Sequence, residues 1–347
     1  MTEPLLSVQD LHVEIATRRG TVQAIDGLSF DVADGETLGL VGESGCGKSM
    51  TLRAILGLLP RGGRVTGGRI LFRGTDLLSI SKDQMRDVRG RSISIIFQEP
   101  MTALNPVIPV GAQIAEGPIA HLGYSKKAAR ERAVELMRRV GIPDPARRCS
   151  SYPHELSGGL RQRVMIAIAL ACEPQLILCD EPTTALDVTI QDQILKLLLD
   201  LQDSSGIGLI FVTHDLAVVS QVCRSIAVMY AAQIVETGTV ESVFTEPRHP
   251  YTLGLLRAVP DFDKVKDMLD SIPGIPPDLV SPPAGCRFRA RCSFAQPDCM
   301  TGEFPLVATG DDRTSACIHW KQCRDSVMGD PVIATGPASG QSHGTEP

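Results

Sequence analysis

The sequence predicts an α/β fold whose core is a buried parallel sheet, to which other layers are added. Three observations lead to this fold class. A glycine-rich turn joins a short apolar strand at residues 37–41 to an apolar helix at residues 50–59. Two further apolar runs, at residues 176–180 and 208–213, end in polar side chains, which is typical of buried parallel strands. Before residue 32, apolar and polar residues alternate, which predicts an antiparallel layer.

The glycine-rich turn fits the pattern G-x-x-x-x-G-K-[ST] and consists of Gly42, Glu43, Ser44, Gly45, Cys46, Gly47, Lys48 and Ser49. Glycines allow successive backbone N–H groups to approach phosphate oxygens closely, and the helix that follows adds its positive end. Lys48 brings a charge to the outer phosphates, and Ser49 offers a hydroxyl to magnesium. An ordinary glycine-rich turn is the alternative, but the flanking strand and helix favour a nucleoside triphosphate site in a P-loop NTPase fold.

Composition limits the possible functions. The chain has 347 residues, enough for one large domain and a smaller one, and 43% of them are hydrophobic. The net charge of −6 and the absence of a basic block disfavour a nucleic-acid partner. No basic and apolar leader is visible, and no apolar run reaches the roughly 18 residues that span a bilayer. We therefore expect a soluble cytoplasmic protein, with any membrane part supplied by other chains.

A further strand is predicted at residues 92–97, and Gln98 lies at its carboxyl end, where side chains of α/β sheets face a ligand. The residues that follow, about 99–165, have the character of a helical insertion. Residues 125–140 read as a helix, and prolines interrupt the chain repeatedly after it.

A second anion site is predicted at the start of the helix that runs to about residue 172. Ser157 is suited to cap this helix, and Ser157, Gly158 and Gly159 leave N–H groups exposed for an anion. One nucleotide does not need two such helix starts that lie far apart in sequence. A dimer that holds ATP between the first site of one chain and the second site of its partner would use both; the alternative is an ordinary helix start.

Acidic residues and a histidine follow the two buried strands. Asp180 is suited to the magnesium shell, and Glu181 is suited to act as the general base that polarises the attacking water. Asp187 lies in the next loop, after Ala185 and Leu186. His214 ends the following strand and is interpreted as a sensor of the outer phosphate, although a lone histidine is usually structural.

Taken together, these motifs resemble the ATPase subunit of the ATP-binding cassette superfamily over about residues 5–245. The resemblance implies a RecA-like core and a head-to-tail dimer with two composite ATP sites, in which Ser157, Gly158 and Gly159 serve the ATP of the partner. It implies catalytic roles for Gln98, Glu181 and His214, magnesium ligands from Ser49, Gln98 and Asp180, and a dimer-contact loop at Asp187. It also places Met50 at the ATP. Residues 12–17 contain no aromatic residue for adenine, which leaves Ile15 as the nearest apolar candidate.

The segments at residues 41–45, 98–106, 247–252 and 272–277 resemble the oligopeptide and dipeptide permease branch of this superfamily. This resemblance implies an importer at the cytoplasmic face of the inner membrane. Its partners would be two transmembrane permease subunits, a paralogous second ATPase subunit that completes a heterodimer, and an extracytoplasmic solute-binding protein. The alternatives are import of nickel, glutathione or another small solute, a non-transport cassette ATPase, an exporter, or a module with an inactive site.

Five of the ten cysteines lie in one C-terminal region, which suggests metal before disulfides in a reducing cytosol. The spacing of four of them resembles a motif of peptide permease ATPases that holds a [4Fe–4S] cluster, which assigns its ligands to Cys286, Cys292, Cys299 and Cys317. Zinc and free thiols are the alternatives. We expect an ATPase domain at residues 1–245, an extension at 246–324 and a disordered tail at 325–347.

Overall fold

The computed structural model describes residues 3–184, 187–258, 271–310 and 312–327. The described residues form two compact units. The first contains segments from 1–11, 29–38 and 49–212, and the second contains segments from 12–28, 39–48 and 213–347. The chain therefore passes from one unit to the other inside the glycine-rich motif, between Lys48 and Ser49. These units do not coincide with the division at residue 245 that the sequence predicts.

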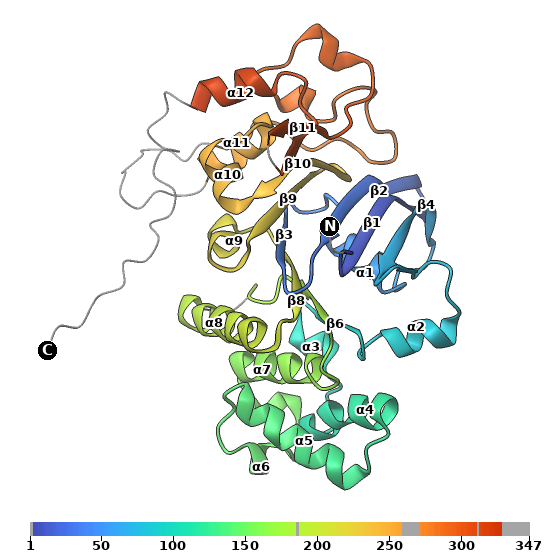
Figure 1. Ribbon diagram of the computed structural model, residues 1–347, viewed down its shortest axis with the longest axis vertical. Helices are drawn as coiled ribbons and strands as arrows, with labels where there is room; N and C mark the ends of the chain where they lie inside the picture. The colour runs from blue at the N-terminus through green and yellow to red at the C-terminus, as the bar shows by residue number, and fades with distance from the viewer. Residues whose placement is uncertain (1–2, 185–186, 259–270, 311, 328–347) are drawn as a thin grey trace, which may run out of the picture. The chain divides into compact units, whose positions relative to one another are not determined.

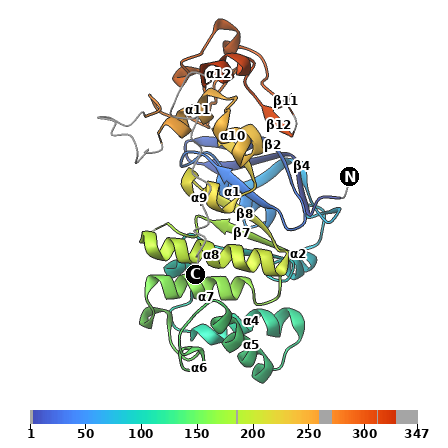
Figure 2. The same ribbon diagram turned by 60° about the vertical axis from the view of Figure 1, so that its left-hand side comes forward.

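Three parallel strands form the core of the first unit (Figures 1 and 2). They are β6 (Ile93–Ile96), β7 (Leu176–Asp180) and β8 (Gly208–Thr213). Ile93 lies opposite Leu176, and Leu176 lies opposite Gly208. All side chains of β7 and β8 are buried, as expected for apolar runs in a covered parallel sheet. The structure thus confirms the buried parallel core.

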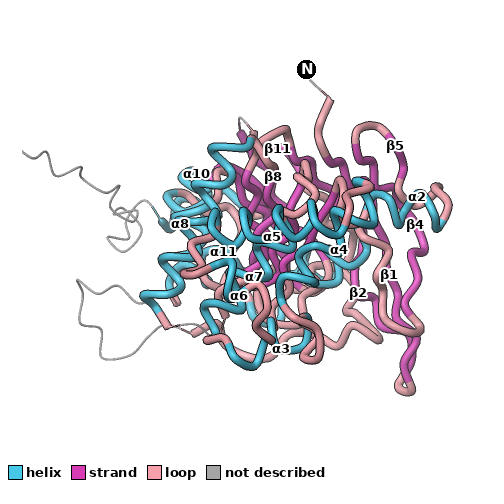
Figure 3. The backbone as a smooth tube through the Cα atoms, turned by 90° about the horizontal axis from the view of Figure 1, so that it is seen from below, coloured by secondary structure: helices cyan, strands magenta, loops and turns pink. Residues whose placement is uncertain are grey.

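A second sheet has the strand order β2-β1-β4-β5 (Figure 3). Its members are β1 (Leu6–Thr17), β2 (Gly20–Val32), β4 (Gly63–Phe72) and β5 (Thr75–Asp76). A two-residue turn joins β1 to β2, and such a short turn requires antiparallel strands. Strands β4 and β5 also pair antiparallel. The structure therefore confirms the antiparallel N-terminal layer.

The expected helical insertion is present between β6 and β7 (Figures 1 and 2). It contains α3 (Pro100–Ala103), α4 (Val110–Leu122), α5 (Lys126–Arg139), α6 (Pro145–Arg148), a 3-10 turn (Pro153–Glu155) and α7 (Gly158–Ala169). Helices α4, α5 and α7 pack against one another. Ser125 caps α5 by accepting a hydrogen bond from the N–H of Ala128 at 3.2 Å, so the helix begins where the sequence predicts. The same unit also contains α2 (Lys82–Val88) and α8 (Val188–Ser205).

The strand and helix on either side of the glycine-rich turn are β3 (Thr37–Val41) and α1 (Lys48–Ile55). The predicted end of this helix, at residue 59, is wrong. Gly57 adopts a φ of +60°, a left-handed conformation that ends helices, so the helix stops before Pro60 is reached. None of the helices in the described part of the chain combines the length and the apolar composition that a membrane span requires.

The sheet of the second unit is antiparallel, in the order β11-β12-β10-β9. Its strands are β9 (Ser225–Tyr230), β10 (Gln233–Thr239), β11 (Val307–Gly310) and β12 (Arg313–Ser315). Its helices are α9 (Leu216–Val222), α10 (Val240–Thr245), α11 (Pro250–Arg257) and α12 (Trp320–Val327), with 3-10 turns at Arg289–Arg291 and Pro297–Met300. Helix α12 includes residues 325–327, where the sequence predicts the tail to begin; residues 328–347 lie outside the described residues.

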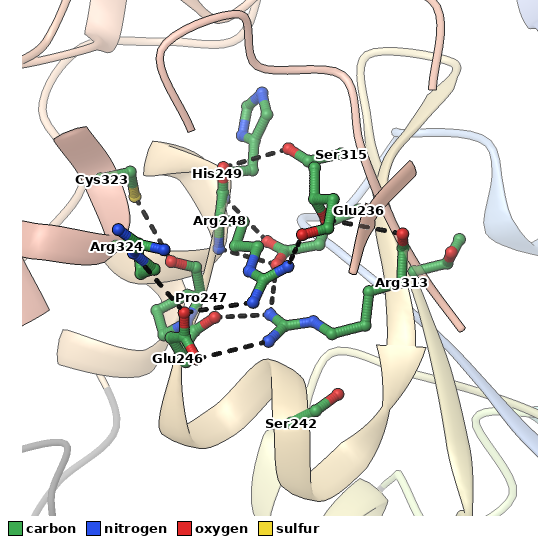
Figure 4. A network of polar contacts seen from close by, with 12 residues as sticks. Glu236, Ser242, Glu246, Pro247, Arg248, His249, Arg313, Ser315, Cys323 and Arg324 are labelled. Atoms are coloured by element: carbon green, nitrogen blue, oxygen red, sulfur yellow. Dashed lines mark hydrogen bonds and ion pairs between the residues drawn. The ribbon is translucent and has the colours of Figure 1, made fainter. Parts of the chain in front are cut away.

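A buried network of charged side chains joins β10 and β12 to the segment that precedes α11 (Figure 4). The carboxylate of Glu236 is fully buried and accepts hydrogen bonds from the backbone N–H groups of Arg248, at 2.7 Å, and His249, at 2.9 Å. The guanidinium of Arg313 lies 3.3 Å from the same carboxylate. Glu246 pairs with Arg248 at 3.2 Å. The network thus attaches β12, near the cysteine-rich region, to the rest of the second unit.

Candidate nucleotide-binding site

The phosphate loop, residues Gly42–Lys48, requires glycine at two positions where backbones approach closely. Gly42 has a φ of +152°, and a Cβ added there would lie 2.1 Å from the carbonyl oxygen of Met229. Gly47 has a φ of +114°, and a Cβ added there would lie 2.7 Å from the carbonyl oxygen of Ala24. These distances are too short for any side chain, so the loop can follow this path only with glycine. Ser44 and Gly45, in contrast, are exposed.

The side chain of Lys48 is folded back over the loop. Lys48 is 5% exposed, and its Nζ donates to the carbonyl oxygens of Gly42, at 2.7 Å, and Glu43, at 3.0 Å. It also lies 3.8 Å from the Sγ of Cys46. This places the positive charge at the centre of the loop, where phosphate oxygens are the expected ligands. Burial raises the pKa of the Cys46 thiol, although Lys48 partly offsets this effect.

Two predicted magnesium ligands meet in the first unit. The Oγ of Ser49 donates a hydrogen bond of 2.6 Å to the Oδ1 of Asp180. Asp180 is the last residue of β7 and is 5% exposed. A hydroxyl and a carboxylate are oxygen ligands of the kind that Mg²⁺ takes. The donor set therefore fits a magnesium ion, and the role of these residues stays a prediction.

Glu181 and Gln98 also lie together, because β6 and β7, the strands that precede them, pair side by side in the sheet. The Nε2 of Gln98 donates to the Oε2 of Glu181 at 3.1 Å. The hydroxyl of Thr184 donates to the same oxygen at 2.9 Å, a contact without any signal in the sequence. Glu181 has a φ of +45°, and its backbone N–H donates to the carbonyl of Val212 at 3.0 Å. A residue other than glycine is strained in this left-handed backbone conformation, and such strain is characteristic of functional positions.

The predicted second anion site is at the start of α7. Ser157 caps this helix, and its hydroxyl accepts a hydrogen bond of 3.4 Å from the N–H of Leu160. Ser157 and Gly158 are exposed. A Cβ added at Gly159 would lie 2.9 Å from the Cγ2 of Ile190 on α8, so a glycine allows these helices to pack closely. The exposure of Ser157 and Gly158 leaves this helix start accessible from solvent, and its role as an anion site stays a prediction.

The remaining candidate residues for ATP binding are described by their position in the fold and their exposure. Asp187 is exposed and caps α8 by accepting from the N–H of Ile190 at 2.9 Å, whereas residues 185–186 of the same loop lie outside the described residues. His214 is exposed and follows β8. Ile15, on β1, and Met50, on α1, are half-buried. No contact of these residues assigns a role, so their parts in ATP binding stay predictions.

Two residues beside the phosphate loop were not found by sequence reasoning. The hydroxyl of Tyr251, on α11, accepts a hydrogen bond of 2.8 Å from the N–H of Glu43. Arg291 forms an ion pair with the carboxylate of Glu43 at 2.6 Å. Tyr251 lies in a segment that the sequence marks as typical of a family extension, but no local pattern connects either residue with Glu43.

The four predicted cysteine ligands share one region of the second unit. The N–H of Cys286 donates to the carbonyl oxygen of Cys299 at 3.0 Å. Burial, and to a smaller extent the neighbouring cysteines, raise the pKa of Cys292 to about 11 and that of Cys317 to about 12. The number and type of these side chains are those of an iron–sulfur or zinc site, and their role as metal ligands stays a prediction.

A smaller set of possible metal ligands overlaps with these cysteines. Asp298, Cys299 and His319 place one ligand atom each within 4.8 Å of one another. The Nε2 of His319 lies 2.9 Å from the Oδ1 of Asp298, and this hydrogen bond lowers the pKa of the exposed Asp298 carboxyl. Among the described residues, this is the one group of three such atoms at these short distances.

Comparison with known families and sequences gives a consistent result. Residues 25–184 match the ABC transporter family, and residues 235–299 match the C-terminal region of oligopeptide/dipeptide transporters. The dipeptide transport ATP-binding protein DppD of Bacillus subtilis is 54% identical over 291 residues, which cover 84% of this chain and 87% of that protein. The oligopeptide transport ATP-binding protein OppD of the same organism is 52% identical over 88% of this chain and 86% of its own length. DppD of Escherichia coli is 48% identical over 90% of this chain and 96% of its own length.

Solved structures share the fold. A dimeric, post-hydrolysis ATP-binding cassette, MJ0796 bound to ADP and Pi, is 26% identical, with a TM-score of 0.61, and covers 68% of this chain and 98% of its own. CbiO1 of Clostridium perfringens, part of an ABC transporter complex, is 29% identical, with a TM-score of 0.59, and covers 70% of this chain and 91% of its own.

Proposed function

Because the chain belongs to the ABC transporter family, and to its oligopeptide and dipeptide branch, we propose that it is the ATP-hydrolysing subunit of an importer for peptides of a few residues. The observation that carries this proposal is the combination of an intact phosphate loop and catalytic-type Glu181 with the oligopeptide/dipeptide C-terminal region at residues 235–299. ATP and Mg²⁺ are the cofactors expected of an ABC ATPase.

The chemistry is phosphoryl transfer to water. Lys48 and the N–H groups of the phosphate loop would hold the phosphates, and Ser49 and Asp180 would hold Mg²⁺, with Gln98 as a further ligand. Glu181 would polarise the attacking water. The hydrogen bond from the side chain of Gln98 to the carboxylate of Glu181 holds the two side chains next to each other. His214 would contact the outer phosphate. Bound Mg²⁺ supplies charge compensation for the phosphates during the transfer.

The exposed start of α7 supports a dimeric arrangement. Ser157, Gly158 and Gly159 would contact the ATP held by the phosphate loop of a second ATPase subunit, with Asp187 at the same interface. We infer that this second subunit is a paralogue, so that the working unit is a heterodimer. ATP binding would close the dimer, and hydrolysis with product release would open it.

The segment after Gln98 is suited to transmit this motion to the membrane. Met101 is 52% exposed, Val107 is 76% exposed, and Ile108 is 36% exposed. Three exposed apolar side chains in one short segment would provide apolar surface for a docking partner. We infer that two transmembrane permease subunits dock there, which places the protein at the cytoplasmic face of the inner membrane. An extracytoplasmic binding protein would deliver the solute.

Peptide import can be distinguished from import of nickel, glutathione or another solute by competition. Uptake of a radiolabelled dipeptide is measured in cells with and without this gene, in the presence of excess tripeptide, glutathione or nickel. We expect loss of dipeptide uptake in the deletion strain and competition by the tripeptide alone. Normal peptide uptake in the deletion strain, with impaired uptake of nickel or glutathione, would contradict the proposal and support the alternative solute.

We also propose that Cys286, Cys292, Cys299 and Cys317 hold a [4Fe–4S] cluster that stabilises the extension. The number and spacing of these cysteines, and the hydrogen bond from the N–H of Cys286 to the carbonyl oxygen of Cys299, support this proposal. When bound, such a group supplies a compact cross-link among the four cysteines. Anaerobically purified protein should contain about four iron and four sulfide per chain and absorb near 400 nm. A colourless protein with one zinc would identify a structural zinc site, and a metal-free protein would indicate free thiols.

A further inference from the structure

Glu43, the second residue of the phosphate loop, is held by the C-terminal part of the second unit. The guanidinium of Arg291 donates two hydrogen bonds to its carboxylate, of 2.6 Å from Nη1 and 2.9 Å from Nη2. The side chain of Arg291 is 4% exposed and that of Glu43 is 28% exposed. A bidentate pair of this kind fixes orientation as well as distance, which a lysine could not do.

Arg291 is itself fixed by its surroundings. Its Nε donates to the carbonyl oxygen of Pro273 at 2.8 Å, and its Nη2 also donates to that of Ile272 at 3.3 Å. Its Nη1 lies 3.4 Å from the hydroxyl of Tyr230. These contacts satisfy the remaining donors, so the guanidinium can present only its Nη1–Nη2 edge to Glu43.

The backbone of Glu43 is held at the same time. Its N–H donates to the hydroxyl of Tyr251, a fully buried residue whose ring contacts Tyr230 with 4.6 Å between centroids. Its carbonyl oxygen accepts from the Nζ of Lys48 at 3.0 Å. Glu43 thus connects Arg291 directly with the lysine that is expected to bind phosphate.

We propose that Arg291 is a positioning residue for ATP binding, which acts by holding Glu43 and thereby the phosphate loop in its nucleotide-binding conformation. The glycines that shape the loop also give it many alternative conformations, so an external constraint reduces the ordering that ATP binding would otherwise require. Arg291 directly precedes Cys292 in the sequence. The cysteine-rich extension, whose part in the cycle is otherwise unassigned, therefore sets the ATP affinity of the cassette.

The experiment compares ATP affinity among variants of the full chain by titration with a fluorescent ATP analogue and Mg²⁺. We expect Arg291→Ala and Glu43→Gln to weaken binding about tenfold each, and the double variant to be no weaker than either single variant, because both remove one interaction. Arg291→Lys should show an intermediate loss. Arg289→Ala is the matched control, since Arg289 is a half-buried arginine of the same 3-10 turn that donates to Ala284 and Met300 of its own segment.

A second measurement separates positioning from general destabilisation. In ATP hydrolysis, Arg291→Ala should raise KM by about tenfold while kcat at saturating ATP changes less than about twofold, because only the loop conformation is affected. If Arg291→Ala does not fold, Glu43→Gln provides the test, since it leaves every other contact of Arg291 in place. In that case, the test of whether the two losses add up uses the double variant that combines Glu43→Gln with Arg291→Lys.

The inference rests on the proposed ATPase function, and the two can fail separately. Wild-type protein that does not bind ATP would refute the proposed function, and the positioning role with it. Wild-type protein that binds ATP, with affinities of Arg291→Ala and Glu43→Gln within twofold of it, would overturn the positioning role alone. Losses that add up in the double variant, or that Arg289→Ala shares, would overturn it too.

Discussion

Replacement of Glu236 by glutamine should change how the stability of this protein depends on pH. Glu236 is fully buried among Arg248, His249 and Arg313, and burial raises its pKa from 4.5 to about 7 (Figure 4). Between these values the folded state binds more protons than the unfolded state, so this group makes the protein less stable as pH rises. The difference corresponds to about 3 kcal/mol, present in full below pH 4.5 and lost as pH rises through 7.

His249, the neighbour of this carboxylate, has the opposite effect. Burial lowers its pKa from 6.5 to about 3, so in this range the unfolded state binds the extra proton and stability increases with pH. The two contributions oppose each other between pH 4.5 and 6.5. When the Glu236 carboxylate is removed, only the effect of His249 remains in this range. It raises the free energy of unfolding by about 1.4 kcal/mol per pH unit.

The assay is urea unfolding of wild type, Glu236→Gln and His249→Asn at several pH values from 4.5 to 7.5. Relative to wild type, the free energy of unfolding of Glu236→Gln should rise more steeply with pH by about 1.4 kcal/mol per unit below pH 6.5. His249→Asn should show a change of slope of opposite sign, because only the Glu236 contribution is left. Parallel pH profiles of Glu236→Gln and wild type would refute the reasoning.

Three further predictions concern the site. Gly47→Ala should abolish measurable ATP binding while circular dichroism stays close to that of wild type, since the added Cβ would collide with the carbonyl of Ala24 within a local loop; wild-type affinity would contradict the loop geometry. Tyr251→Phe should weaken ATP binding several-fold in calorimetric titration, because the N–H of Glu43 loses its acceptor; an unchanged Kd would show that this hydrogen bond is dispensable. Ser157→Ala should leave ATP binding by the isolated chain unchanged but reduce hydrolysis by the assembled transporter more than about tenfold, and full hydrolysis would exclude a role across the dimer.

The parts of the fold that could be predicted from sequence are those with a local signal. The strand, glycine turn and helix around Lys48 follow from a short pattern, and the place of Glu181 follows from the apolar strand before it. The contact between Gln98 and Glu181 could not be predicted in the same way, because it depends on the pairing of β6 with β7, which no local pattern specifies.

The parts that could not be predicted depend on pairings between distant segments. Arg291 lies 248 residues from Glu43, and neither residue stands in a pattern that selects the other. The antiparallel pairing of β10 with β12 also joins distant segments, and it makes the C-terminal extension a part of the second unit. The early end of α1 depends on the left-handed conformation of Gly57. Glycine permits several conformations, so its presence in the sequence does not show where the helix ends.

The central claim is that this chain hydrolyses ATP to drive peptide import, with Glu181 as the general base. The most direct test reconstitutes the complete transporter in liposomes and measures ATP hydrolysis and peptide uptake with wild-type chain and with Glu181→Gln. We expect the variant to bind ATP with wild-type affinity, to hydrolyse it at least about 100-fold more slowly and to support no net peptide uptake. Hydrolysis and uptake by Glu181→Gln at near wild-type rates would contradict the account.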